Sequence, residues 1–298
     1  MDVAARLCEL TGVPVDRLAS LGRQHAWTLY RGELADGRSV FVKAAPDDAE
    51  PSADRLDSDA ELFVPGGVFA AEAAGLRWLA EADAAIVPPV IADDDRMLVL
   101  PWLAPESASP AAAAQFGRAL AELHATSPAT YGAPWPGFIA TLPLDNSPSA
   151  GEWGSWYAER RLAPYLPAAA QYLGRDGIRL IERVMQRIGH LSGPPEPPSR
   201  IHGDLWSGNV HWSGQRALLI DPAGHGGHRE TDLAMLALFG APHLELILAA
   251  YRESAPLASG WRQRIPLHQL HPLLVHVVLF GGSYRGMLLA AAASALAG

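Results

Sequence analysis

The sequence lacks the features that mark secreted, cysteine-ligated metal and nucleic-acid-binding proteins. Its 298 residues include one cysteine, Cys8, so neither an internal disulfide nor a cysteine-based metal site can form. A single thiol fits a reducing compartment, and we expect a cytoplasmic protein. Lysine and arginine number 23 against 32 acidic residues, and no basic stripe is visible. We therefore expect no nucleic-acid partner.

Long uninterrupted apolar runs are also missing. The N-terminus, MDVAARLCEL, carries acids and has no signal-peptide core. The most apolar stretches, 273–281 and 287–297, are broken by Arg285 and several glycines, and fall short of the roughly 18 residues of a membrane helix. We expect no membrane partner and predict that both stretches form buried C-terminal helices.

Negative charge is concentrated in one segment. Of the formal net charge of −9, the stretch 46–66 supplies seven acids against one arginine, so the rest of the chain is close to neutral. The stretch also contains proline, serine and glycine without clean periodicity, and we interpret it as a solvated loop. Its acids are Asp47, Asp48, Glu50, Asp54, Asp57, Asp59 and Glu61.

Strand patterns precede helical ones along the chain. An Asp36-Gly37 pair between apolar runs predicts a β-hairpin, and IVPPVIADDDRMLVLPWL predicts two more strands around an acidic turn. Apolar periodicity predicts helices over 2–11, 68–82, 110–125, 152–173 and 176–191. This order favours an α+β protein with a small sheet-rich N-lobe, residues 1–103, and a larger, mostly helical C-lobe, residues 104–298.

The segment HGDLWSGN carries the clearest chemistry. It supplies Asp204 and, five residues later, Asn209; Asp221 follows at the end of the apolar strand ALLI. Phosphoryl transfer from ATP requires a base that orients the attacking hydroxyl, and oxygen ligands for Mg²⁺. We predict Asp204 as the catalytic base and Asn209 and Asp221 as Mg²⁺ ligands. The three letters HGD alone would more often be a simple turn.

A nucleotide site is expected upstream. Lys43 ends the apolar strand SVFVK, and Glu72 lies in the following helix, so an ion pair between them would present the ammonium to ATP phosphates. Glu81, near the end of that helix, is the less favoured partner. Taken alone, an exposed strand-end lysine and a surface glutamate are the ordinary interpretation.

The remaining nucleotide contacts have weaker signals. No GxGxxG motif is present, and Gly22 in SLGRQHAWTLYRG is the candidate for a phosphate-covering loop. His25 and Trp27 beside it either contact the nucleotide or pack under the hairpin. Pro101, Trp102 and Leu103 are candidates for a hinge that meets adenine, or for an ordinary lobe-linking strand.

Three longer segments resemble one kinase family. HGDLWSGN, IDPAGHGGHRETDLAMLALFG and YRESAPLASGWRQR are similar to the fructosamine (ketosamine) kinases, a branch of the protein-kinase-like fold that also includes the aminoglycoside phosphotransferases. The resemblance implies a bilobal fold. It also implies ATP- and Mg²⁺-dependent phosphorylation of the sugar 3-hydroxyl of small ketosamines or glycated protein lysines, a deglycation reaction.

The resemblance also suggests supporting roles around Asp204. His202 and Asp232 would brace the catalytic loop, although Asp232 also suits the charge of a helix N-terminus. Trp206 would stack on the sugar or pack within the C-lobe. His225 and His228 flank two glycines, and we interpret them as a turn rather than a metal pair.

Two other functions use the same residues. An aminoglycoside or choline phosphotransferase would need the same base and metal ligands, so these do not discriminate between acceptors. A nucleotide-binding scaffold without activity is disfavoured because Lys43, Asp204, Asn209 and Asp221 are all present. The sequence gives no sign of the oligomeric state.

Overall fold

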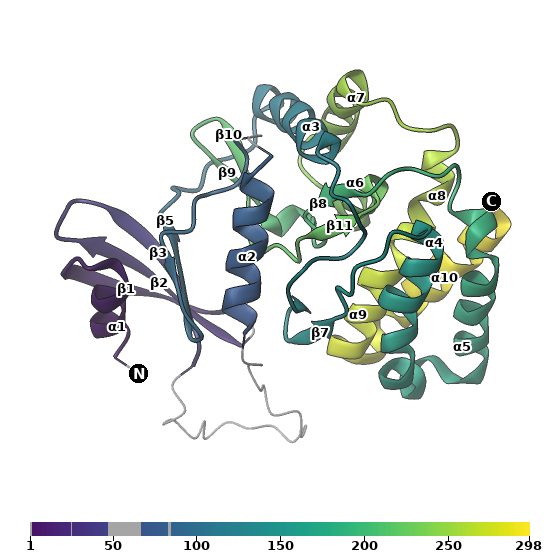
Figure 1. Ribbon diagram of the computed structural model, residues 1–298, viewed down its shortest axis with the longest axis horizontal. Coiled ribbons are helices and arrows are strands. Elements are labelled where there is room, and N and C mark those ends of the chain that lie inside the picture. The colour runs from purple at the N-terminus through teal and green to yellow at the C-terminus, as the bar shows by residue number, and fades with distance from the viewer. Residues whose placement is uncertain (1, 25, 47–66, 83–84) are drawn as a thin grey trace.

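The chain folds into a sheet-rich lobe and a helical lobe (Figure 1). The computed structural model describes residues 2–24, 26–46, 67–82 and 85–298. His25 and nearly all of the acidic stretch 46–66 lie outside the described residues. The smaller lobe is a five-stranded antiparallel sheet in the order β1-β2-β3-β5-β4. Its strands are β1 (Val15–Gln24), β2 (Trp27–Leu34), β3 (Ser39–Ala44), β4 (Ala92–Asp93) and β5 (Met97–Pro101).

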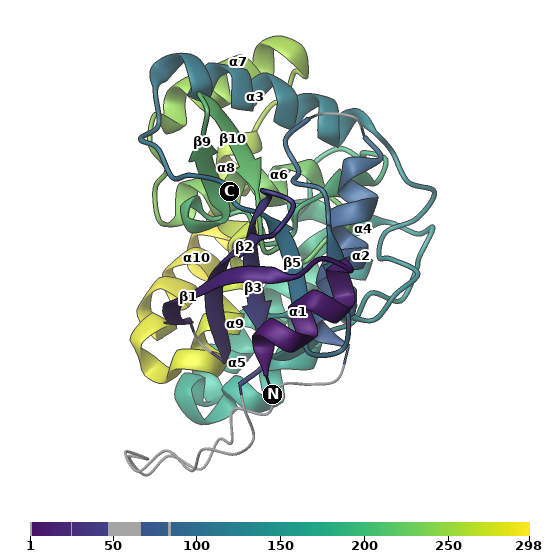
Figure 2. The ribbon, with the colours of Figure 1, turned by 90° about the vertical axis from the view of Figure 1, so that its left-hand side faces the viewer.

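The two faces of this sheet are covered by different helices. Helix α1 (Val3–Thr11) packs Leu7 against Val40 and Val42, whereas α2 (Val68–Ala80) packs Phe69 and its neighbours against the opposite face (Figure 2). Because side chains alternate along a strand, β3 turns Val40 and Val42 toward α1 and Lys43 toward α2. The lysine therefore reaches the side that faces the C-lobe.

Strand β1 was not predicted. We expected the segment around Gly22 to be a phosphate-covering loop, but Gly22 lies within β1, at a register shift and with φ 104°. Most side chains of this edge strand are exposed, so the alternation that reveals a half-buried strand is absent. From the β1–β2 hairpin, Gln24 and Trp27 line the cavity between the lobes, whereas Gly22 does not.

The larger lobe has two apolar cores. One joins α3 (Pro110–Ala125), α6 (Arg229–Leu238), α7 (Leu244–Ser254) and the hairpin β9 (Val210–Ser213)–β10 (Arg216–Leu219). The other joins α4 (Trp153–Tyr157), α5 (Leu166–Leu191), α9 (Leu270–Phe280) and α10 (Arg285–Ala297). Between them, β8 (Ser199–Ile201) pairs with β11 (His225–Gly227) and positions the loop that follows. The predicted α+β class with two lobes is confirmed.

The helices before the catalytic loop differ in detail from those predicted. The expected helix 152–173 is divided into α4, the π-helical turn η1 (Ala158–Leu162) and the 3₁₀ turn η2 (Ala163–Tyr165). The predicted break between 173 and 176 is present, because Gly174, with φ 67° and ψ 175°, is not helical and interrupts α5 there. The segment before α4 contains a short hairpin of β6 (Gly137–Ile139) and β7 (Leu142–Leu144).

The C-terminal apolar stretches form helices, as predicted. By length and composition alone, the run Trp261–Ala297 is apolar enough to cross a membrane. The structure divides it into α8 (Trp261–His268), α9, the turn η4 (Gly281–Tyr284) and α10. Leu270, Leu273, Leu274 and Val277 of α9 are buried in the C-lobe core, which is the behaviour of a core helix.

Candidate active site

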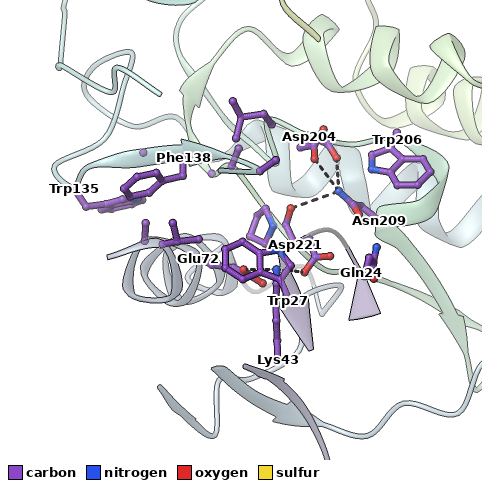
Figure 3. Close-up of a pocket in the computed structure, with 18 of the residues that line it drawn as sticks. Gln24, Trp27, Lys43, Glu72, Trp135, Phe138, Asp204, Trp206, Asn209 and Asp221 are labelled. Atoms are coloured by element: carbon purple, nitrogen blue, oxygen red, sulfur yellow. Dashed lines mark hydrogen bonds and ion pairs between the residues drawn. The ribbon is translucent and has the colours of Figure 1, made fainter. Parts of the chain in front are cut away.

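A cavity between the lobes brings together most of the predicted site (Figure 3). The N-lobe contributes Lys43 and Glu72, and the C-lobe contributes the segments that carry Asp204 and Asp221. The site therefore combines groups more than 170 positions apart. Its lining comprises Gln24, Trp27, Leu29, Phe41, Lys43, Val68, Ala71, Glu72, Trp135, Gly137, Phe138, Ile139, Ala140, Asn146, Asp204, Trp206, Asn209, Asp221, Pro222, Ala223 and Gly224.

Asp204 and Asn209 are connected within the catalytic loop. The Nδ2 group of Asn209 donates to Asp204 Oδ2 at 3.1 Å and to the backbone oxygen of Asp204 at 2.9 Å. The turn η3 (Ser207–Asn209) makes this possible, because it brings residue 209 back toward residue 204. The amide nitrogen is thereby occupied, and Asn209 Oδ1 is left to face another ligand.

Asp232 and His202 hold the catalytic loop from behind. The carboxylate of Asp232, fully buried, accepts from the backbone N–H of His202 at 2.7 Å and of Gly203 at 2.9 Å. His124 Nε2 contacts the same carboxylate at 3.1 Å. Asp232 lies in the first turn of α6, so it also complements the helix dipole.

His202 fixes the same loop through both ring nitrogens. Its Nδ1 accepts from the N–H of Asp204 at 3.3 Å, so its Nε2 carries the proton that is donated to Ile220 O at 2.9 Å. Burial lowers the pKa of this imidazole, which favours the neutral form that such a pattern needs. The ring links the loop of Asp204 to the residue preceding Asp221.

Lys43 stands between two carboxylates. Its Nζ lies 2.7 Å from Glu72 Oε2 and 3.1 Å from Asp221 Oδ1, and the lysine and glutamate side chains are 8% and 7% exposed. Asp221 adopts φ 53°, an uncommon conformation for a residue other than glycine and one found at functional sites. The predicted partner of Lys43 is therefore in place, whereas Glu81 instead contacts Arg200 at 2.9 Å.

The titration of these groups follows from their burial and mutual charge. Burial, together with the Asp221 carboxylate, raises the pKa of Asp204 to about 8. Burial opposes the charge of Lys43, but Asp221 and Glu72 outweigh it and raise the lysine pKa. Burial also raises the pKa of Glu72 to about 7, because Glu72 shares the single cation of Lys43 with Asp221. At Asp221 the charge of Lys43 outweighs the effect of burial and lowers the pKa.

The oxygen atoms at this site suit Mg²⁺. Among the described residues, Asn209 Oδ1 has no hydrogen-bond partner, and the Asp221 carboxylate, whose Oδ1 contacts Lys43 Nζ at 3.1 Å, lines the same cavity. One amide and one carboxylate oxygen, with room left for phosphate and water, form the donor set that Mg²⁺ prefers. The residues therefore fit the predicted ion.

Comparison with known proteins identifies the family. The family model described as fructosamine kinase matches residues 65–296. The chain belongs to the fructosamine kinase family. A relative from Thermus thermophilus, named "Probable ketoamine kinase TTHA1179", is 37% identical over 224 residues, which are 75% of this chain and 81% of the relative.

Solved structures agree with the family assignment and show that a second family of phosphotransferases shares the fold. A crystal structure from Thermobifida fusca, provisionally named a fructosamine-3-kinase, is 52% identical, with a TM-score of 0.91 over 100% of this chain and 99% of that one. An aminoglycoside phosphotransferase, solved with AMP-PNP and hygromycin B, shares the fold with a TM-score of 0.64 at 14% identity, over 99% of each chain. The protein-kinase-like fold is thereby confirmed, and the chain is a phosphotransferase of the fructosamine kinase family.

Two of the three hinge candidates of this fructosamine kinase family member form hydrogen bonds through their backbone. The N–H of Trp102 donates to Ser39 O at 2.9 Å, and Leu103 O accepts from His211 Nε2 at 2.9 Å. The Trp102 ring lies 4.9 Å from the guanidinium of Arg31. None of Pro101, Trp102 and Leu103 lines the cavity, so their contact with adenine remains a prediction.

The positions of Trp27 and Trp206 are compatible both with ligand contact and with packing. Trp27 lines the cavity, and its ring is 5.3 Å from Lys43 Nζ and 5.1 Å from the Phe69 ring. Trp206 also lines the cavity and meets the Phe239 ring edge-on at 6.5 Å. A side chain at Gly208 would collide with the Trp206 ring, so this glycine is required for the tryptophan to fold over the loop.

Several residues that line the cavity were not predicted from the sequence. Trp135, which precedes β6, and Phe138, which lies within it, are across the cavity from Trp206 (Figure 3), and Asn146 follows the same hairpin. Gln24 reaches the cavity from the end of β1. The aromatic pair in APWPGF was the available signal, because exposed loops seldom carry large aromatics without a partner.

The segment that carries His225 and His228 is not the turn suggested by the sequence, because His225 begins strand β11 and His228 is the N-cap residue of α6. His228 does lie near Glu230 and His268, at distances within reach of one ion. However, Arg264 holds Glu230 through two hydrogen bonds, of 2.8 Å and 2.5 Å. A cation against this carboxylate opposes metal binding, and we interpret the group as a buried structural network.

Proposed function

We propose that the protein transfers the γ-phosphate of ATP to the sugar 3-hydroxyl of ketosamines. The observation that carries the proposal is the position of Asp204 beside Asn209, in one cavity with Asp221 and Lys43, in a member of the fructosamine kinase family. Ketosamines are the rearranged adducts of sugars with amines, including protein lysines.

Asp204 acts as the base in this scheme. It accepts the proton of the 3-hydroxyl while that oxygen bonds to the γ-phosphorus, and the bond from phosphorus to the β,γ-bridging oxygen breaks to release ADP. A pKa raised to about 8 makes the carboxylate basic enough to take a proton near neutral pH. Asn209 Nδ2 keeps the carboxylate oriented toward the acceptor.

Lys43, Asn209 and Asp221 serve the nucleotide. Lys43 presents its ammonium to the phosphates, and Glu72 fixes its position. Asn209 and Asp221 would hold Mg²⁺, which offsets negative charge on the phosphates. ATP use is supported by the family and by the AMP-PNP complex of the aminoglycoside phosphotransferase that shares the fold.

The division of labour follows the two lobes. We assign nucleotide binding to residues 1–103 and the base, metal ligands and acceptor site to residues 104–298. Phosphorylation at the 3-hydroxyl makes the adduct unstable and releases the amine, so the reaction would serve deglycation. We place it in the cytoplasm, where ATP is made available and where a single free thiol, Cys8, is compatible with the redox state.

A phosphate-transfer assay tests the acceptor. The protein is incubated with Mg-ATP and ribulosyl-, erythrulosyl- or fructosyl-lysine, with choline and kanamycin as the competing acceptor classes. We expect transfer to the ketosamines. Transfer only to choline or kanamycin would replace this proposal by the aminoglycoside- or choline-kinase alternative, and transfer to no acceptor would favour a scaffold.

A variant tests the base. Asp204→Asn should lower kcat by about 10²–10⁴-fold, the range of general-base catalysis, while the Kd for Mg-ATP changes little. Asp176→Asn is the matched control, since the Asp176 side chain on α5 is almost fully exposed and far from the chemistry. Full activity of the Asp204 variant would contradict the assignment.

A further inference from the structure

Asn146 is a buried amide on the cavity wall whose orientation is fixed by an arginine. It lies between β7 and α4, is 5% exposed and lines the cavity that contains Asp204. Arg161 Nη2 donates to Asn146 Oδ1 at 2.8 Å. A guanidinium carries donors only, so the oxygen of the amide must face Arg161 and the nitrogen must face the other way.

The nitrogen of this amide is an unused donor. Among the described residues, Asn146 Nδ2 donates no hydrogen bond, and it is not sealed from the cavity. The space around it depends on Gly137, another cavity residue, because a Cβ there would lie 2.5 Å from Nδ2. The chain thus leaves room for a two-proton donor and supplies no partner of its own.

The support behind Asn146 is extensive. Arg161 is 2% exposed, and its Nη1 also donates to Asp145 O at 2.5 Å. The preceding Arg160 binds the Asp145 carboxylate at 2.8 Å, and the N–H of Ala133 donates to Asn146 O at 2.9 Å. Both arginines reach the same turn from the π-helical segment η1, a type of irregularity that often marks functional sites.

Arg161 is an unusual residue to bury in a merely structural role. Its guanidinium lies 4.2 Å from the Trp156 ring centroid, and within the described chain no carboxylate forms an ion pair with it. Its hydrogen-bond acceptors are two backbone oxygens and the amide oxygen of Asn146. A buried cation without a counter-charge is costly. Here it orients and polarises the Asn146 amide, which strengthens the N–H donors on the cavity side.

The chemistry of the donor indicates what it contacts. An uncharged amide suits an uncharged oxygen, such as a hydroxyl or keto group, better than a phosphate. The positive charge that would bind phosphate lies elsewhere in the cavity, on Lys43 beside Asp221. A sugar in the acceptor site presents several such oxygens around the 3-hydroxyl that reacts.

We propose that Asn146 contacts the acceptor, donating a hydrogen bond from Nδ2 to a keto or hydroxyl oxygen of the ketosamine sugar, and that Arg161 is its positioning residue. The inference rests on the proposed ketosamine kinase activity and adds to it a determinant of substrate specificity. A site that binds a substrate oxygen in this way rejects analogues that lack that oxygen.

The isosteric variant Asn146→Asp separates the donor from the support. The new carboxylate still accepts a hydrogen bond from Arg161 and supplies this cation with a counter-charge, but it has no proton to donate to the sugar. We expect kcat/KM for ribulosyl- or fructosyl-lysine to fall by about 10–100-fold, mainly through KM, as for one lost hydrogen bond to a desolvated partner. The KM for ATP should stay within about twofold, and the melting temperature should not fall.

Two further variants complete the test. Gly137→Ala, which displaces Nδ2, should show the same selective loss toward the ketosamine. Gln171→Glu, an amide-to-carboxylate change on the exposed face of α5, should match the wild type. A ketosamine kcat/KM within twofold of the wild type for Asn146→Asp overturns the inference, as does an equal loss toward ATP. Wild-type protein without ketosamine transfer overturns the proposed function instead, and the inference with it.

Discussion

The buried group of Lys43, Glu72 and Asp221 predicts a large and pH-dependent cost for removing its single cation. In Lys43→Met, two carboxylates at 2.7 and 3.1 Å from the former ammonium lose their only positive partner in the group. A methionine of similar length fills the space, so the effect reports charge rather than volume.

The magnitude follows from the burial of the pair. Breaking a buried ion pair by removing one partner costs about 3–5 kcal/mol, because the other charge is left in a poorly solvated site. That loss lowers the melting temperature by about 5–8 °C in a chain of 298 residues. The exposed pair of Arg118 with Glu253, whose side chains are 50% and 73% exposed, supplies the matched control: Arg118→Met should cost about 0–1 kcal/mol.

The sign of the pH dependence is fixed by the acids. Burial already raises the pKa of Glu72 to about 7, and loss of Lys43 raises it further. A raised folded-state pKa means that the folded protein binds more protons than the unfolded chain, so stability falls as pH rises toward that pKa. Lys43→Met should therefore differ from the wild type more at pH 8 than at pH 6.

A double-mutant cycle in urea or thermal unfolding checks this reasoning. Adding Glu72→Gln to Lys43→Met removes one stranded carboxylate and should recover about 0.5–3 kcal/mol relative to additivity. Unchanged stability of Lys43→Met, or a deficit that does not grow between pH 6 and pH 8, would refute the account of the buried charges. Nucleotide affinity, measured in parallel, should fall in both single variants.

Two predictions concern stability away from the site. Burial opposes the charge of Glu230, but hydrogen bonds from His268 and Arg264 lower its pKa to about 2. The ionised carboxylate should therefore contribute about 3 kcal/mol to the free energy of unfolding above pH 4.5, and this contribution should be lost as pH falls toward 2. Glu230→Gln should flatten that part of the acid-unfolding profile. Gly117→Ala should lower the melting temperature sharply because its Cβ would meet Ile247 O where α3 packs on α7, whereas Gly189→Ala in α5 meets nothing and should stabilise by about 0.5–1 kcal/mol; equal melting temperatures would contradict this packing.

The sequence could predict the parts of the site that depend on local spacing. Asp204 and Asn209 lie on one short turn, and strand periodicity turned Lys43 toward the helix that carries Glu72. These residues meet in the structure as the spacing suggested. Their distances, and the second carboxylate that Asp221 offers Lys43, depend on how the lobes pack and have no local signal.

The parts that escaped prediction have physical reasons in common. Strand β1 is mostly exposed, so no apolar alternation marks it. The strands β6 and β7 are three residues long, too short for a period to be seen. Asn146 owes its orientation to Arg161, fifteen positions away on a π-helical turn that ordinary helical spacing does not anticipate. A contact of that kind is visible only after the chain has folded.

The approach of α2 to the segment after Asp221 has a consequence for how the lysine–carboxylate group forms. Gly75 of α2 faces Gly224 so closely that a Cβ on Gly224 would lie 3.3 Å from Gly75 Cα. Two residues without side chains thus let one backbone rest on the other, one turn along α2 from Glu72 and three residues after Asp221. The helix is seated on the segment that follows Asp221, so the two carboxylates and the lysine come together during folding. Formation of this lysine–carboxylate group would then need only the folding of the two lobes, and no later rearrangement of α2.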